Sequence, residues 1–156
     1  MQHTAAFSSA SEEWATPQEF YDAWNAVYQF DLDAAATDAN AKAPRYYTKA
    51  DDGLTQPWEG TVFCNPPYGR GIDKWIQKGY MAARNGATVV MLIPARTDTR
   101  WWHDYVARAA EIHFIKGRLK FGGHHWNAPF PSCVVVFRPQ PIAAPMVSFI
   151  EQGGRP

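Results

Sequence analysis

The sequence has 156 residues, no net formal charge and two cysteines, which is typical of one globular domain from a reducing compartment and excludes nucleic-acid binding through bulk charge. The longest apolar run, 87–95, is too short to cross a membrane, and the amino terminus lacks the features of a signal peptide, so we expect a cytoplasmic protein. The cysteines and the five histidines have no paired spacing, which argues against a metal site.

The first third of the chain predicts a leader, a helix and a strand. Residues 1–11 are small and polar without a period, and we expect a loose leader there. The segment TPQEFYDAWNAVY has helical spacing of apolar residues and predicts a helix from Pro17 to about Val27, with Thr16 able to cap it. Residues 28–36 then alternate and predict a first strand that ends at Asp33.

Residues 37–60 are polar and broken by prolines and glycine, and we interpret them as a long irregular connection that belongs to a ligand site. Residues 61–64 predict a buried strand, 71–86 a helix and 87–94 a second buried strand, which together form a strand, helix, parallel strand unit. The chain is therefore expected to be an α/β domain with a mostly parallel, Rossmann-like sheet.

The last third predicts a helix over 99–110 and strands over 111–117 and 132–137, which are joined by a loop rich in glycine, histidine and proline. Residues 139–156 contain several prolines and are expected to be a surface tail, in which only 146–150 packs.

Charge is unevenly distributed along the sequence. Residues 1–64 contain three Lys or Arg and ten Asp or Glu, whereas residues 65–120 contain ten and four, respectively. The acidic part suits a cationic ligand or a ribose pocket, and the basic part suits a phosphate backbone. Chance scatter over a solvated surface is the alternative explanation.

The strand over 61–64 runs into Asn65-Pro66-Pro67-Tyr68. Neither proline can donate a backbone hydrogen bond, so this turn ends the strand and leaves the Asn65 side chain and the Pro66 carbonyl as free acceptors. Ligands of open α/β sheets bind at the carboxyl ends of strands, which makes the turn a candidate site. A tight proline turn with a surface tyrosine is the structural alternative.

The turn matches the [DNS]PP[YFW] pattern, and with the segments WATP, FDLDAAA, DDGL, PARTDTRWW and GRLKF it resembles the compact phage-type Dam family of adenine-N6 DNA methyltransferases. The resemblance extends from about Trp14 to Phe137. It implies a methyltransferase domain over 12–138, S-adenosylmethionine as cofactor, double-stranded DNA as partner and, if the protein is phage-encoded, the host cytoplasm as location.

The resemblance also implies roles for individual residues. The Asn65 amide oxygen and the Pro66 carbonyl hold the adenine amino group, and Tyr68 stacks on the flipped base, so that the catalytic residues are Asn65, Pro66, Pro67 and Tyr68. The cofactor is expected to contact Thr16, Pro17, Asp33, Asp51 or Asp52, and Asn65, with Asn40, Lys42 and Tyr47 as weaker candidates. Helix capping by Thr16 and Pro17, and an ordinary turn at Asp51 and Asp52, are equally simple explanations.

On the DNA side, Arg96, Arg100, Arg118 and Lys120 are expected to contact phosphates or base edges. Trp101, Trp102 or Trp126 would fill the space that the flipped adenine leaves in the duplex. Core packing is the better expectation for at least one of Trp101 and Trp102. The loop 122–131 would carry any sequence preference, and His124 and His125 would be solvated or contact phosphate.

The segment DAAATDAN lacks the glycine-rich turn usual after the first strand, and the span from Asp33 to Asp51 is short, so the cofactor half of the sheet is expected to be shortened. Two alternatives stay open. The same turn occurs in methyltransferases that act on a glutamine amide or an RNA amino group, and a chain without the glycines is compatible with a catalytically silent nucleic-acid-binding remnant.

Overall fold

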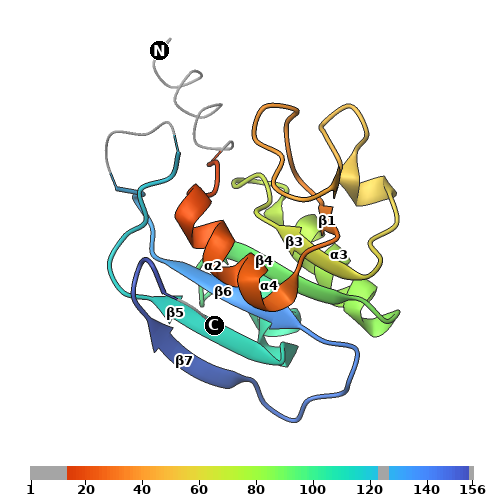
Figure 1. The fold of residues 1–156 in the computed structure, drawn as a ribbon. Helices are drawn as coiled ribbons and strands as arrows, with labels where there is room; N and C mark the ends of the chain where they lie inside the picture. The colour runs from red at the N-terminus through yellow and green to blue at the C-terminus, as the bar shows by residue number, and fades with distance from the viewer. Residues whose placement is uncertain (1–13, 123–126, 155–156) are drawn as a thin grey trace.

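The computed structural model describes residues 14–122 and 127–154, and these fold into a seven-stranded sheet with helices on both faces (Figure 1). The α/β class and the mostly parallel sheet expected from the sequence are confirmed. Among the described residues, no helix is long and apolar enough to cross a membrane.

The strands are β1 (Leu32–Asp33), β2 (Arg45–Tyr46), β3 (Thr61–Cys64), β4 (Thr88–Pro94), β5 (Glu111–Ile115), β6 (Ser132–Phe137) and β7 (Met146–Ile150). The α-helices are α2 (Gln18–Tyr28), α3 (Ile72–Arg84) and α4 (Arg100–Asp104), and short 3₁₀ helices cover Gly53–Thr55 and Val106–Arg108.

The strand order is β2-β1-β3-β4-β6-β5-β7. The pairs β1–β2, β1–β3, β3–β4 and β5–β7 are parallel, and β6 pairs antiparallel with both β4 and β5. The carboxyl ends of β1, β3 and β4 therefore meet at one edge of the sheet, where ligands of open α/β sheets bind.

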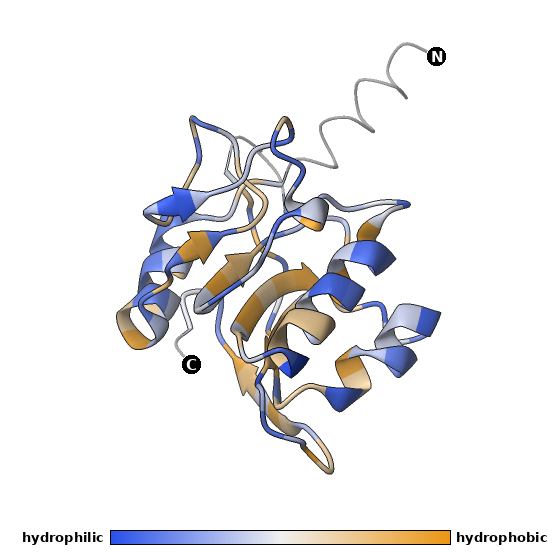
Figure 2. Ribbon diagram, turned by 90° about the vertical axis from the view of Figure 1, so that its right-hand side faces the viewer, coloured by the Kyte–Doolittle hydropathy of each residue, from blue (hydrophilic) through white to orange (hydrophobic). Residues whose placement is uncertain are grey.

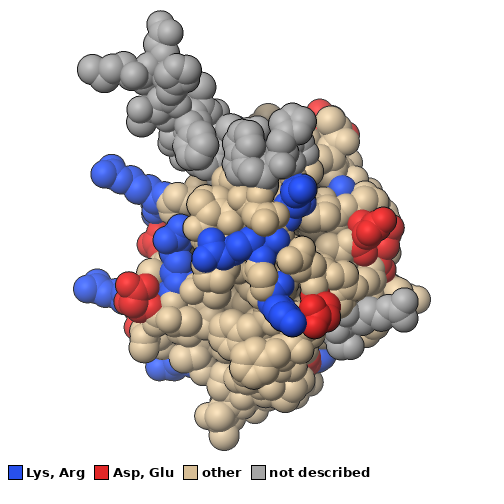
Figure 3. Space-filling model, turned by 90° about the vertical axis from the view of Figure 1, so that its left-hand side faces the viewer, with Lys and Arg blue, Asp and Glu red and all other residues tan. Residues whose placement is uncertain are grey.

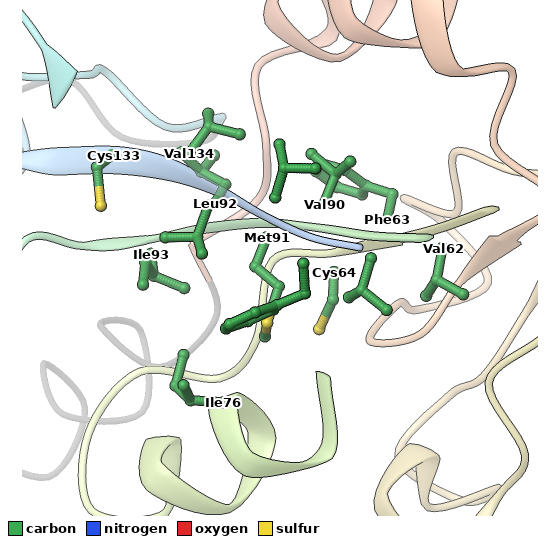
Figure 4. Close-up of a cluster of buried hydrophobic side chains, with 14 of the residues drawn as sticks. Val62, Phe63, Cys64, Ile76, Val90, Met91, Leu92, Ile93, Cys133 and Val134 are labelled. Atoms are coloured by element: carbon green, nitrogen blue, oxygen red, sulfur yellow. The ribbon is translucent and has the colours of Figure 1, made fainter. Parts of the chain in front are cut away.

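The central strands are buried on both faces, which explains their nearly continuous apolar sequences. Phe63 and Val90 point to one side of the sheet, while Cys64 and Met91 point to the other side toward Ile76 of α3 (Figure 4). Both cysteines are free and buried, as expected. Figure 2 shows this apolar sheet between helices whose outer surfaces are hydrophilic.

The first helix begins later than its capping residue suggested. Pro17 is the N-cap residue of α2, no side chain caps the helix, and the Thr16 hydroxyl instead accepts a hydrogen bond from Asn65. The expectation that Thr16 caps this helix is therefore wrong, because its oxygen is already bonded to a residue of the turn after β3. One face of α2 buries Phe20, Tyr21 and Trp24 against the sheet.

The helix expected over 99–110 is interrupted. The Thr99 side chain accepts from the Trp102 amide and caps α4, but the helix ends at Asp104. A 3₁₀ turn follows and buries Val106 completely, so the break directs this apolar side chain into the core. At the other end of the chain, Met146–Ile150 pairs with β5 and forms the edge strand β7, but Met146, Val147 and Phe149 are exposed.

Candidate active site

A cavity of about 300 Å³ opens at the carboxyl ends of β1 and β3. Its walls come from the segment before α2, the two strand ends and the irregular connection of residues 37–60. The lining residues are Trp14, Ala15, Thr16, Asp33, Ala34, Ala35, Ala36, Thr37, Asn40, Lys42, Tyr47, Thr48, Lys49, Asp52, Gly53, Phe63, Asn65, Pro67 and Trp75.

Asp33 ends β1 and places a buried carboxylate in this cavity; the residue is 3% exposed. One oxygen, Oδ2, accepts from the Lys42 backbone amide at 3.2 Å, while Oδ1 has no hydrogen-bond partner among the described residues. The Lys42 ammonium donates to Gln18 instead of pairing with Asp33. Burial dominates and raises the pKa of Asp33 to about 6, against the lowering effects of the backbone amides of Lys42 and Ala35 and of the Lys42 charge.

Asn65 follows β3, and its side-chain amide is held in one orientation. The nitrogen Nδ2 donates to the backbone oxygen of Trp14 and, at 3.0 Å, to the hydroxyl of Thr16. Both N–H groups are thus used, and the oxygen Oδ1 is buried without a donor from any described residue. A buried acceptor without a partner costs free energy, and a ligand N–H group would remove this cost.

The two prolines differ in position. Pro67 lines the cavity and Pro66 does not, although no described residue donates a hydrogen bond to the Pro66 carbonyl. Tyr68 lies outside the cavity as well. Its ring is 7% exposed, its hydroxyl donates to the Leu92 carbonyl at 3.0 Å, and Phe130 packs edge-on against it. Contact between Tyr68 and a ligand therefore requires the Phe130 side chain to move.

Two neighbouring aspartates, Asp51 and Asp52, differ in their relation to the cavity. Asp52 lines the cavity, whereas the Asp51 carboxylate accepts from the amide and the hydroxyl of Thr48 at 2.8 and 3.0 Å. Gly53 is required beside them, because a Cβ there would lie 2.3 Å from the Ala34 carbonyl oxygen. Asp51 thus stabilises its own turn, and Asp52 is the carboxylate available to a ligand.

The connection after β1 has no glycine and is held by side chains. Asn40 Oδ1 accepts from the Thr37 amide at 2.7 Å, and Thr37 Oγ1 accepts from the Asn40 amide at 3.1 Å. Asn40, Lys42 and Tyr47, expected as weaker cofactor candidates, all line the cavity. Alanines at 34–36 let the backbone approach the cavity where the usual motif has glycine.

Several lining residues were not identified from the sequence as site residues, among them Trp14, Lys49 and Trp75. Trp75 has the helical spacing of a core residue of α3, yet it is only half-buried and lies 6.1 Å from Trp58 across the cavity wall. Its incomplete burial was not predicted, because the helical spacing of Trp75 is the same as that of the buried core residues of α3.

The basic residues expected to contact DNA lie outside the cavity. Arg96 is exposed just after the carboxyl end of β4, 6.0 Å from the centre of the Phe130 ring. Arg118 donates to the Ala128 carbonyl at 3.4 Å, and Arg100 and Lys120 are exposed. Lys and Arg side chains gather on the side of the molecule where the loop after β5 lies (Figure 3).

Of the aromatic residues considered for the space of a flipped base, Trp101 and Trp102 are both buried, and Trp102 stacks on Phe114. Core packing is therefore confirmed for this pair. Pro17 lies beside the cavity without lining it. The leader 1–11, and His124, His125 and Trp126 in the loop 122–131, lie outside the described residues.

The sequence is similar to known phage proteins. A family model described as DNA N-6-adenine-methyltransferase (Dam) matches residues 3–150. The DNA N-6-adenine-methyltransferase of Escherichia phage T1 is 32% identical over 109 residues, which cover 68% of this chain and 45% of the relative. The protein of the same name from Haemophilus phage HP1 (strain HP1c1) is 28% identical over 141 residues, which cover 85% of this chain and 82% of the relative. The chain thus spans less than half of the T1 relative and most of the HP1 relative.

Proposed function

Because this chain belongs to the Dam family of DNA N-6-adenine-methyltransferases, we propose that it transfers a methyl group from S-adenosylmethionine to the N6 amino group of adenine in double-stranded DNA, with the base flipped out of the helix. The observation that supports the proposal most directly is the Asn65 amide, whose nitrogen donates to Trp14 and Thr16 and whose buried oxygen receives no hydrogen bond from any described residue.

The acceptor geometry answers a chemical problem of the substrate. The lone pair of an adenine amino nitrogen is delocalised into the ring, so the nitrogen is a poor nucleophile. Acceptance of its two hydrogens by Asn65 Oδ1 and the Pro66 carbonyl would orient the nitrogen and withdraw the lone pair from conjugation. No nucleophilic side chain is needed for this step, because the residues act through position and local electrostatics.

The cavity residues fit a sulfonium cofactor. Asp33 Oδ1 is a buried acceptor without a partner among the described residues, and its carboxylate lies where a positive charge would relieve the cost of burial. Asp52, which also lines the cavity, would accept from the adenine amino group of the cofactor, with Trp75 as an apolar surface nearby. When bound, S-adenosylmethionine supplies an electrophilic methyl group. Thr16 and Lys42 would bind at the same end as Asp33.

Cationic side chains at the same edge of the sheet would bind the DNA. Arg96 and Arg100 follow β4, which is the neighbour of β3 and hence of the Asn65 turn. Contacts from these residues, Arg118 and Lys120 to phosphates would hold a duplex over the turn. Stacking of the flipped adenine on Tyr68 stays a prediction, and it requires the ring to be uncovered from Phe130.

The proposal is tested by incubating the protein with radiolabelled S-adenosylmethionine and, separately, duplex DNA, RNA and a protein extract. We expect label only on DNA adenine. Asn65→Ala should reduce the rate by at least about a hundredfold, since a preorganised acceptor that acts on the reacting group is lost. Asn85→Ala, at an exposed asparagine at the end of α3, is the matched control and should retain the wild-type rate.

The same experiment separates the alternative functions. Label on RNA or on protein in place of DNA would show that the methyl acceptor is an RNA amino group or a glutamine amide. A protein that binds DNA but labels none of the three acceptors would be the silent remnant, and would contradict the proposal.

A further inference from the structure

A second cavity, of about 280 Å³, lies at the opposite edge of the sheet from the candidate active site. It is lined by the end of α3 and the end of β6, where Phe137 pairs with Val89 near the amino end of β4. Asn65 lies beyond the carboxyl end of β3, at the other edge. The seven residues of β4, at roughly 3.3 Å each, separate the two edges by about 20 Å. The second cavity is therefore a separate site.

This second cavity is positively charged. Its lining includes Arg84, Arg108 and Arg138, and none of its lining residues is an aspartate or a glutamate. The concentration is notable in a chain with zero net formal charge. Arg138 forms an ion pair with Glu111, which lies outside the lining, so the unpaired positive charge of this hollow comes from Arg84 and Arg108.

One of the three arginines is fixed in place. The Arg138 guanidinium donates to Glu111 Oε2 at 2.8 Å and to the Tyr28 hydroxyl at 3.2 Å. Arg84 and Arg108 are exposed, and no carboxylate of the described residues forms an ion pair with either of them. The cavity thus combines one preorganised cation with two whose hydrogen-bond donors are available to a ligand.

An aromatic and proline-rich wall shapes the rest of the cavity. The Arg84 guanidinium lies 6.0 Å from the centre of the Tyr80 ring, and Phe137 packs edge-on against Tyr80 at 6.0 Å. Pro139 and Pro141 border the opening and restrict its backbone. Guanidinium groups held against aromatic rings beside a rigid backbone suit the planar, bidentate recognition of phosphate oxygens.

We propose that this second cavity binds a phosphate-bearing anion, held by Arg84, Arg108 and Arg138. The group is either part of a free phosphate ligand or a DNA backbone phosphate remote from the methylated base. The inference does not depend on the proposed methyl transfer, because the two sites share no residue.

The proposal is tested by calorimetric titration of the full chain with sodium pyrophosphate at low ionic strength. We expect saturable binding that Arg84→Gln/Arg108→Gln weakens by roughly ten- to a hundredfold, because two charge-assisted contacts are lost. Arg45→Gln/Lys116→Gln removes the same charge at two exposed positions outside the cavity and should leave pyrophosphate binding unchanged. Thermal unfolding of both double variants verifies that the fold is intact.

A second titration, with a short duplex, identifies the source of the phosphate. If Arg84→Gln/Arg108→Gln also weakens duplex binding and pyrophosphate competes with the duplex, the ligand is the DNA backbone; if duplex binding is unchanged, it is a free phosphate compound. Absence of pyrophosphate binding at millimolar concentration, or equal weakening by the two double variants, would overturn the proposal. A separate assay of methyl transfer by the Arg84→Gln/Arg108→Gln variant tests the candidate active site independently of the second cavity.

Discussion

At the scale of single residues, the orientation of the Asn65 amide depends on groups that are far away in the sequence. Its nitrogen donates to the Trp14 carbonyl and the Thr16 hydroxyl, so a rotation that exchanges nitrogen and oxygen would bring acceptors face to face. Thr16 thus holds the Asn65 amide and lines the cavity, and under the proposed function it would act on the reaction through Asn65 as a positioning residue.

Thr16→Val keeps the shape of the side chain but removes the acceptor for Asn65. We expect kcat to fall by about tenfold, as one hydrogen bond is lost and the amide gains a second orientation. Thr16→Ser keeps the hydroxyl and should restore most of the rate. Steady-state kinetics of both variants measure the effect, and a rise in KM for S-adenosylmethionine with unchanged kcat would instead place the hydroxyl in cofactor binding alone.

The Asp33 carboxyl predicts a pH dependence. Its pKa in the folded protein is about 6, above the roughly 3.9 of an unfolded aspartate. The stability of the fold therefore decreases as pH rises through this interval, and the whole decrease is present above pH 6, where the buried carboxyl is ionised. A cationic ligand prefers the ionised form. We therefore expect affinity for S-adenosylmethionine to weaken by about tenfold from pH 7 to pH 5. Calorimetric titration at both pH values tests this, and Asp33→Asn should bind weakly with no such trend; a wild-type affinity that is equal at both values would contradict the role.

At the scale of secondary structure, α3 and the sheet form the rigid base that fixes the Asn65 turn. Gly79 permits their close approach, because a Cβ at this position would lie 2.7 Å from the Met91 sulfur of β4 and 3.4 Å from Val89. A larger side chain there separates the helix from the strand next to the turn.

Gly79→Leu should lower the free energy of unfolding by about 1–3 kcal/mol, since the added side chain overpacks this interface. Gln77→Leu, at an exposed position of the same helix, is the matched control and should change stability by less than about 0.5 kcal/mol. Urea unfolding monitored by tryptophan fluorescence measures both. Equal effects of the two variants would show that helix propensity or surface polarity, and not the helix–sheet contact, determines the loss.

Elements with strong local signals were predictable. The apolar strands β3 and β4 are bounded by proline and glycine, and the turn at Asn65 follows from its two prolines. Strand β2 was not predictable from the sequence. Its two residues show neither a period nor an apolar face, and the strand is defined only by its backbone pairing with β1.

Contacts between distant segments limited the prediction of the site in the same way. The local motif identifies Asn65 as an acceptor, but its partners Trp14 and Thr16 precede it by 51 and 49 residues. The burial of Tyr68 likewise depends on Phe121 and Phe130, which come from the loop after β5. A sequence motif therefore predicts the chemistry of the turn but neither the orientation of its amide nor the cover over its tyrosine.

At the scale of the whole molecule, the uneven charge of the sequence becomes a spatial arrangement. The acidic first part of the chain contributes Asp33 and Asp52 to the cavity, and the basic part contributes Arg96 and Arg100 just beyond the neighbouring strand end. Under the proposed function, this arrangement would attract a cationic cofactor and a polyanion to adjacent surfaces at one edge of the sheet, although the net charge of the protein is zero.

This arrangement predicts how DNA binding responds to salt. Each cation that neutralises a phosphate contributes about 0.9 to the slope of the logarithm of affinity against the logarithm of salt concentration. Arg96→Gln and Arg100→Gln should each lower that slope by about one and weaken binding to unrelated duplexes equally. Arg45→Gln, at an exposed position of β2 across the sheet, should leave the slope unchanged, so fluorescence anisotropy at several salt concentrations distinguishes a local DNA surface from a general effect of charge. If Arg45→Gln lowered the slope as much as the other two variants, the duplex would be held by the overall field of the protein, and a surface at the Asn65 edge would be contradicted.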